Sequence, residues 1–293
     1  MCASDHHIPP PAGTHVKLSD VPLGGWYPFL MQWQVPVLVS IVYATLAFYS
    51  NYKIGKRPSV TKNIPKPSAV KTNTSPKKAS KKSVLAPMTM IVLIHNTVLA
   101  VYSAWAFWGV FPAFVQKIIT EGWQNGLCDM DGMLWNTVLF KHVYLFYISK
   151  FYELLDTAII IAKGRKASFL QIYHHAGVIV IMFLANYYSS AASIFIVWEN
   201  AGVHTIMYTY YALTAIGINP PGKQYLTSLQ IFQFLFGQSF VLFYVITPNC
   251  QSSSQRVWLW ALTTYLLPLI YLFVQFFSKT YNNKKRADLQ KLE

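Results

Sequence analysis

The stretch IFIVWENAGVHTIMYTYYALTAI, residues 194–216, decides which kind of fold this sequence can form. It is long enough for a helix that crosses the bilayer core, which needs about 20 mostly apolar residues. Asn200, His204, Tyr208 and Tyr211 are spaced so that they lie on one face of that helix. Polar side chains are costly in lipid, so this face is predicted to point into a helix bundle.

Composition extends this interpretation to the whole chain. Apolar residues make up 54% of the 293 residues and charged residues 12%, about half of the quarter that is usual in soluble proteins. An all-α integral membrane protein with seven transmembrane helices is therefore predicted. The seven predicted helices cover Tyr27–Ser50, Val84–Val115, Leu134–Ala162, Ser168–Tyr187, Ile194–Ile216, Tyr225–Ile246 and Val257–Ser278.

Basic residues gather in the hydrophilic gaps between these segments and produce the net charge of +14. The largest gap, Asn51–Ser83, holds ten Lys or Arg and no acid, which predicts a disordered linker. With this linker in the cytosol, nineteen Lys or Arg lie on the cytosolic side and three on the other. The positive-inside rule then predicts a lumenal segment at 1–26, a membrane domain at 27–278 and a cytosolic tail at 279–293. Membrane topology explains this charge better than nucleic-acid binding, for which no motif is present.

The cysteines are few and contain no C-x-x-C pair, which argues against a zinc ribbon or a redox motif. In the predicted topology Cys128 and Cys250 both lie in lumenal loops. We therefore expect a Cys128–Cys250 disulfide, because the lumen of the secretory pathway is oxidising. Two free thiols are the alternative, since a shared compartment does not supply the geometry of a bond.

The third apolar segment is the least hydrophobic and contains the run KFYELLDT at residues 150–157. Lys150, Glu153 and Thr157 share one helix face, and Asp156 is within reach of Glu153. Each ionisable group inside a bilayer costs at least about 2.5–3.5 kcal/mol, so such groups mark a functional interior. The alternative is an ion-pair cluster that only holds the bundle together.

Polar residues in the neighbouring segments extend this interior. Segment four contains Q-x-x-H-H, segment five continues into M-Y-x-Y-Y, and segment six contains T-x-x-Q-x-x-Q. Their side chains complete a predicted polar chamber, whose added members are Gln171, His174, His175, Met207, Gln230 and Gln233. His95 and His142 stand apart from these motifs in the sequence.

In this order, these motifs resemble the ELO family of very-long-chain fatty-acid elongases. The usual family box is H-x-x-H-H, and Gln171 replaces its first histidine, as in filamentous-fungal and algal or protist branches. The resemblance implies a 3-ketoacyl-CoA synthase of the endoplasmic reticulum membrane, with acyl-CoA and malonyl-CoA as substrates. It also implies that six of the seven helices surround a narrow acyl tunnel, with CoA entering from the cytosol. Implied partners are membrane lipid and the ketoacyl-CoA reductase, dehydratase and enoyl-CoA reductase of the cycle, with a homodimer as one state.

A decarboxylative condensation needs an acyl acceptor and stabilisation of an enolate. No cysteine lies in a motif, so imidazole is the remaining good nucleophile near neutral pH. By resemblance to the family we expect His174 to carry the acyl group, with His175 and His204 moving protons or stabilising charge. Asn200, Gln230 and the two tyrosines of the stripe would orient them, and Gln171 would orient His174 or His175 through a hydrogen bond. Neither a metal nor a cofactor is expected.

Two other classes of protein share some of these features. A membrane di-iron desaturase or hydroxylase also uses histidine boxes, but it needs about eight histidines, whereas three cluster here. A seven-helix receptor or lipid transporter would match the layout, but its function does not require paired histidines facing acids. Which histidine carries the acyl group, and which chain lengths are accepted, are left open by the motifs.

Overall fold

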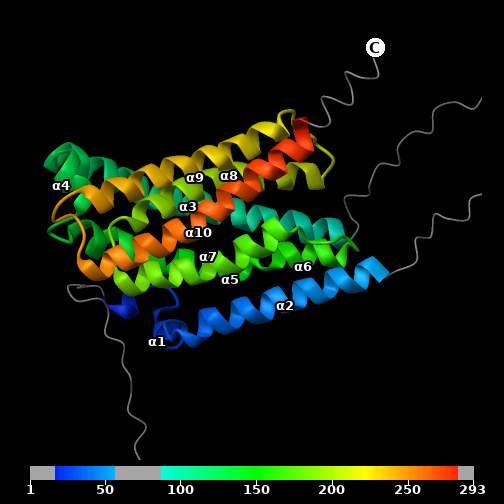
Figure 1. Ribbon diagram of the computed structural model, residues 1–293, viewed down its shortest axis with the longest axis horizontal. Helices are drawn as coiled ribbons and strands as arrows, with labels where there is room; N and C mark the ends of the chain where they lie inside the picture. Colours follow the sequence, from blue (N-terminus) through cyan, green and yellow to red (C-terminus); the bar gives the residue numbers. More distant parts are fainter. Residues whose placement is uncertain (1–16, 57–86, 283–293) are drawn as a thin grey trace, which may run out of the picture.

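Helices form the whole of the regular structure in the computed structural model, which describes residues 17–56 and 87–282. They lie side by side as an elongated bundle (Figure 1). The α-helices are α1 Tyr27–Leu30, α2 Gln34–Lys56, α3 Pro87–Glu121, α4 Trp123–Cys128, α5 Phe140–Glu153, α6 Leu155–Ala162, α7 Phe169–Tyr188, α8 Ser193–Ala215, α9 Lys223–Ile246 and α10 Ser253–Phe277. The predicted lumenal segment up to residue 16, the linker from 57 and the tail from 283 lie outside the described residues.

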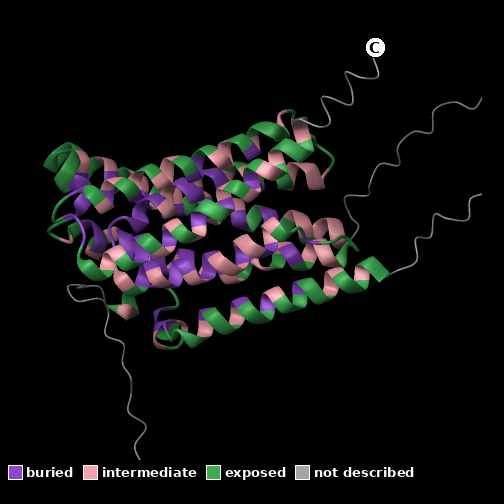
Figure 2. Cartoon of the chain, viewed as in Figure 1, coloured by how far each residue is buried: buried purple, intermediate pink, exposed green. Residues whose placement is uncertain are grey.

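The bundle is apolar outside and holds its charged groups inside. Ile41 of α2 and Trp108 of α3 are 59% and 67% exposed, whereas Lys150 and Glu153 of α5 are almost fully buried. Buried positions line the inner faces of the helices (Figure 2). This arrangement suits lipid as the surrounding solvent. Among the described residues, five helices are long and apolar enough to cross a membrane: α2, α3 with its extension to Cys128, α7, α9, and α10 with its extension to Tyr281.

The third predicted segment, Leu134–Ala162, is not one helix. A π-helical turn at Trp135–Leu139 precedes α5, and a break at Leu154 separates α5 from α6. The Leu154 N–H donates to the Phe151 carbonyl, three residues back, which tightens the chain at the break. Because this turn lies between Glu153 and Asp156, their side chains reach different partners. Helices α5, α6 and α8 are not among the five candidate spans. With 14 and 8 residues, α5 and α6 are each too short to cross alone, and the polar stripe of α8 lowers the hydropathy of an otherwise long helix.

Helix α2 begins seven residues later than its predicted segment and extends six residues into the predicted linker. The Asn51 amide donates to the Ala167 carbonyl at 2.8 Å and accepts from the Ala167 N–H at 2.9 Å. This contact stabilises the end of α2 against the α6–α7 connection. Helix α2 otherwise packs on α7, while α3 runs along α8, and α10 packs on α7 and α9. Residues of α7, α8, α9 and α10 can thus face a common interior.

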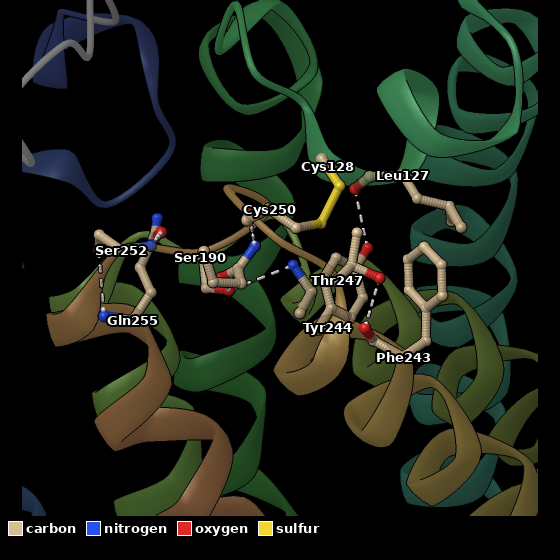
Figure 3. Close-up of a disulfide and its surroundings, with 11 residues drawn as sticks. Leu127, Cys128, Ser190, Phe243, Tyr244, Thr247, Cys250, Ser252 and Gln255 are labelled. Carbon is tan, nitrogen blue, oxygen red and sulfur yellow. Dashed lines mark hydrogen bonds between the residues drawn. A yellow bond between two sulfur atoms is a disulfide. The ribbon is translucent and has the colours of Figure 1, made fainter.

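A disulfide joins Cys128 and Cys250 at the end of the bundle opposite the α6–α7 connection. Figure 3 shows the disulfide and the hydrogen bonds around it. The Tyr244 hydroxyl donates to the Leu127 carbonyl at 2.8 Å. Ser252 and Gln255 form a capping box at the start of α10, each bonding the other's backbone N–H. These bonds connect α4, α9 and α10 at this end.

Candidate active site

A narrow cavity lies between α7, α8, α9 and α10. At one end it is lined by His174, Asn200 and Gln233, together with Tyr265 from α10. Deeper in the bundle, toward the disulfide end, its walls are apolar and aromatic. Phe195 and Phe240 stack there with ring centroids 3.8 Å apart, and Tyr244 lies beside them; the apolar wall consists of Val178, Ile181, Ala192, Phe195, Ile196, Phe234, Phe240, Val241, Tyr244, Leu262, Leu266 and Leu269.

Tyr265 determines the orientation of the half-buried His174 ring. Its hydroxyl donates to the His174 carbonyl at 3.1 Å and lies 3.0 Å from His174 Nδ1. Because the hydroxyl has one proton and directs it to the carbonyl, Nδ1 must carry the proton of the second bond. His174 Nε2 then keeps its lone pair. Tyr265 is 91 residues from His174 in the sequence, and none of the motifs includes it.

A buried ion pair connects α5 to α8. Lys150 Nζ lies 2.8 Å from Glu153 Oε1 and donates to Asn200 Oδ1 at 3.1 Å. Ser149 also donates to Glu153 Oε1, at 3.3 Å. His204 Nδ1 is 3.9 Å from the same oxygen, one helical turn along α8 from Asn200. The first half of the predicted polar stripe therefore faces a lysine–glutamate pair.

Asp156 collects a second group of side chains. Its Oδ1 is 2.8 Å from His95 Nε2, its Oδ2 accepts from the Tyr208 hydroxyl at 2.8 Å, and His175 Nε2 is 3.9 Å from Oδ2. His95 is on α3, 61 residues before Asp156. His95 is isolated in the sequence but not in the fold. Helix α3 packs along α8, and Tyr208 of α8 bonds the same Asp156 carboxylate. His142 Nδ1 instead donates to the Val138 carbonyl at 2.8 Å, and the His142 ring lies against Trp105.

Gln171 and Thr157 form a third contact, next to the histidine pair. The Gln171 amide donates to Thr157 Oγ1 at 3.0 Å, and Tyr43 of α2 shares a 2.8 Å bond with the same hydroxyl. We predicted that Gln171 would bond His174 or His175, and the structure gives its amide to Thr157 instead. Ser168 caps α7 by accepting from the Gln171 N–H, and the Gln171 side chain in this first turn of α7 reaches Thr157 of α6.

The other predicted residues lie on α8 and α9. The Gln230 amide contacts the Met207 sulfur at 3.3 Å, and Gln233 lines the cavity. Tyr211 is 38% exposed, so the stripe leaves the buried interior after Tyr208.

Comparison with known protein families decides how this arrangement should be interpreted. The GNS1/SUR4 family (ELO) matches residues 28–289, which is most of the chain. The protein belongs to the GNS1/SUR4 (ELO) family.

Similar proteins are named as elongases. Fatty acid elongase A of Dictyostelium discoideum is 31% identical over 207 residues, 68% of this chain and 74% of its own. Very long chain fatty acid elongase 3 of Homo sapiens is 32% identical over 202 residues, 66% of this chain and 73% of its own. Fatty acid elongase 5 of Trypanosoma cruzi is 31% identical over 174 residues, 58% and 67% of the two chains. This ELO member is therefore a membrane enzyme of fatty-acid elongation.

The sequence motifs do not include several polar residues that lie at the site. They are Tyr43, His95, Glu199 and Tyr265, from α2, α3, α8 and α10. One signal could have found His95 and Glu199, because each is an ionisable residue inside an apolar segment. Tyrosine is common in membrane helices, so Tyr43 and Tyr265 gave no comparable signal.

Proposed function

We propose that this protein is the condensing enzyme of fatty-acid elongation, a very-long-chain 3-oxoacyl-CoA synthase. It joins a long-chain acyl-CoA to malonyl-CoA and releases 3-ketoacyl-CoA, CO2 and CoA. The observation that carries the proposal is the position of His174: a histidine with its Nε2 lone pair free stands at the polar end of a cavity whose remaining walls are apolar. That combination suits a nucleophile at the head of a hydrocarbon chain.

In the proposed first step, His174 Nε2 attacks the thioester carbonyl of acyl-CoA. The C–S bond breaks, and the departing CoA takes up the proton that the acylated ring gives up. The acyl group then remains on the imidazole while its tail lies in the apolar part of the cavity. The apolar walls keep water from the reactive acyl-imidazole.

In the second step, malonyl-CoA loses CO2 and the electron pair of the broken C–C bond forms an enolate. The enolate carbon attacks the acyl carbonyl, the C–N bond breaks, and 3-ketoacyl-CoA forms. The imidazole takes back a proton and returns to its first state. A covalent relay lets the two CoA substrates use one narrow site in turn.

The remaining polar groups are proposed to position this chemistry. Lys150, Glu153 and Asn200 form a connected buried set that orients α8 and the His204 ring. His204 and His175 are the proposed proton carriers and donors to the enolate oxygen. No metal or cofactor is invoked beyond the two CoA substrates.

We further propose that α8 and the α5–α6 pair also cross the membrane, which makes seven spans, six of them around the cavity as an acyl tunnel. Lys53 and Lys56 end α2 beside the Lys163–Lys166 connection, and this basic end would face the cytosol. At the other end, Lys117 is 2.6 Å from Asp131 and 2.9 Å from Glu121. The hydrogen bond that Lys117 donates to Asp131 lowers the pKa of the Asp131 carboxyl.

This orientation puts the N-terminus in the lumen of the endoplasmic reticulum and lets CoA enter from the cytosol. The product would pass to the reductase, dehydratase and enoyl-CoA reductase of the cycle. The Gln171 variant of the histidine box supports placing the chain near the filamentous-fungal and algal or protist branches.

Purified protein given acyl-CoA alone tests the covalent step. We expect stoichiometric release of free CoA and the added mass of one acyl chain on the peptide that contains His174. Addition of malonyl-CoA should discharge the adduct into 3-ketoacyl-CoA. Elongation without any covalent species would replace the relay with a direct condensation in a ternary complex. Absence of malonyl-CoA-dependent product across a panel of acyl-CoAs would reject the proposed reaction.

A further inference from the structure

Glu199 is a buried carboxyl within the wall of the cavity. It lies on α8, is 8% exposed, and its Oε1 atom has no hydrogen-bond partner among the described residues. Other buried acids have at least one hydrogen-bond partner: Lys150 donates to Glu153 Oε1, and the N–H groups of Leu134 and Trp135 donate to Asp129, whereas no described residue bonds Glu199 Oε1. A buried polar group without a partner is costly. Glu199 therefore needs a partner that the described protein residues do not supply.

Gly237 of α9 makes room for this carboxyl. A β-carbon at Gly237 would stand 3.1 Å from Glu199 Oε2, which is closer than ordinary van der Waals contact. The absence of a side chain there lets the carboxyl extend toward the cavity instead of being displaced. Gly237 itself lines the cavity, so the carboxyl and the open space meet at this level of the helix.

Gln233 offers a second unsatisfied group in the same wall. It is 8% exposed and its Oε1 atom also has no partner among the described residues. Gln233 precedes Gly237 by one helical turn on α9, so the two are separated by about 6 Å along the axis. A carboxyl and a primary amide thus border one otherwise apolar passage. Their oxygens without a partner in the described part of the chain, Glu199 Oε1 and Gln233 Oε1, can each accept a hydrogen bond from a small polar group such as a hydroxyl.

We propose that Glu199 and Gln233 form a subsite for a hydroxyl group carried on the acyl chain, so that hydroxylated fatty acyl-CoA is a preferred substrate class. The hydroxyl O–H donates to the Glu199 carboxyl, beside Gln233 Oε1, which no described residue bonds. The carboxyl can accept in either protonation state. The inference rests on the proposed function in one respect only, which is that the cavity holds an acyl chain.

The position of the pair determines the selectivity. Glu199 lies one residue before Asn200 and therefore deeper along α8 than His204, by about 7.5 Å at 1.5 Å per residue. An acyl chain fixed at its thioester end would place one particular carbon at this depth. Preference for a hydroxyl should therefore peak at one chain position and fall on either side of it.

Elongation of octadecanoyl-CoA compared with its monohydroxy isomers tests this, with the hydroxyl moved along the chain. We expect kcat/KM to be higher by about tenfold or more for the best isomer, since satisfying one buried polar group is worth about a factor of ten or more. Glu199→Leu should remove that preference, measured as the ratio of kcat/KM for the best monohydroxy isomer to kcat/KM for octadecanoyl-CoA in the same variant. Glu199→Gln should keep part of it.

Gly237→Ala is a second probe, because its added methyl displaces the carboxyl without removing it. It should lower the preference for the same isomer. Ile206→Leu, at a lipid-exposed position of α8, is the matched control and should change nothing. A flat preference along the chain, or a preference that survives Glu199→Leu, would overturn the subsite.

Binding to the purified protein separates this inference from the proposed reaction. Free hydroxyoctadecanoic acid should displace a fluorescent fatty acid more strongly than octadecanoic acid from the wild type, and equally from Glu199→Leu. This result would support the subsite even if no acyl-CoA were elongated. Equal displacement from the wild type would reject it even if elongation proceeded normally.

Discussion

The histidine-containing end of the bundle and its disulfide end hold their polar groups by different means. Near the histidines, side chains bond to other side chains across helices: Lys150 to Asn200, Asp156 to Tyr208, and Gln171 to Thr157. At the other end, a disulfide and bonds to backbone groups join the buried segments, as with Tyr244 and the Leu127 carbonyl. Lys117 at this end forms ion pairs with the exposed carboxylates of Glu121 and Asp131.

This difference predicts that one end serves the reaction and the other end stabilises the fold. Side-chain networks leave ring nitrogens and carboxylates at defined positions, where they can serve a reaction. Bonds to the backbone and the disulfide only restrict how the helices are connected. Changes at the first end should therefore alter turnover, and changes at the second should alter unfolding.

The largest expected effect is at His174. His174→Ala should lower elongation by about 10³-fold or more, because it removes the proposed nucleophile. The unfolding temperature of this variant should change little. His142→Ala is the matched histidine control, since His142 bonds a carbonyl of its own helix region, and it should retain elongation. If the acyl adduct moved to His204 in His174→Ala, the roles of the two histidines would be exchanged.

Lys150→Met should be the most damaging change to folding at the same end. It leaves Glu153 buried without its cation, and loss of one member of a buried pair costs about 3–5 kcal/mol. Denaturant unfolding in detergent measures the loss. The double variant Lys150→Met with Glu153→Leu should regain much of that stability and remain inactive. Recovery of activity as well would mean that the pair only holds the bundle together.

At the disulfide end, the Cys128→Ser, Cys250→Ser double variant should lose about 2–4 kcal/mol of stability. The bond closes a loop between residues 122 apart, so it constrains the unfolded chain strongly. Elongation below the lowered unfolding temperature should equal that of the wild type. A fall in kcat at that temperature would show that the two ends are coupled.

Tyr265→Phe should reduce kcat by about 10- to 100-fold, with a smaller effect on KM, because His174 Nδ1 loses its acceptor. Tyr173→Phe is the control. Its hydroxyl donates to the Tyr265 carbonyl at 3.1 Å, so it touches the same residue without contacting the imidazole. Equal losses in the two variants would assign Tyr265 a structural role.

The smallest effect is expected for Gln171→His, which restores the commoner family residue. Elongation should fall by less than about tenfold, since one neutral hydrogen bond contributes about 0.5–1.5 kcal/mol. An imidazole at this position can still donate to Thr157. Complete loss of turnover with normal unfolding would show that the two branches of the family build this site differently.

Sequence alone determined the membrane character, most of the helix segments and a part of the polar interior. Hydropathy reports the solvent around a helix, and the helical period reports which residues share a face. The burial of Asn200, His204 and Tyr208 follows from their spacing. Elongase motifs added the resemblance that the family comparison bears out.

Only the tertiary structure decided which faces meet and at what depth. Asp156 bonds His95 across 61 residues, and Tyr265 orients His174 across 91. The break at Leu154 and the gap at Gly237 beside Glu199 likewise have no signature in hydropathy. Periodicity describes one helix at a time, whereas the rotation and offset between helices are set by side-chain packing across the whole bundle.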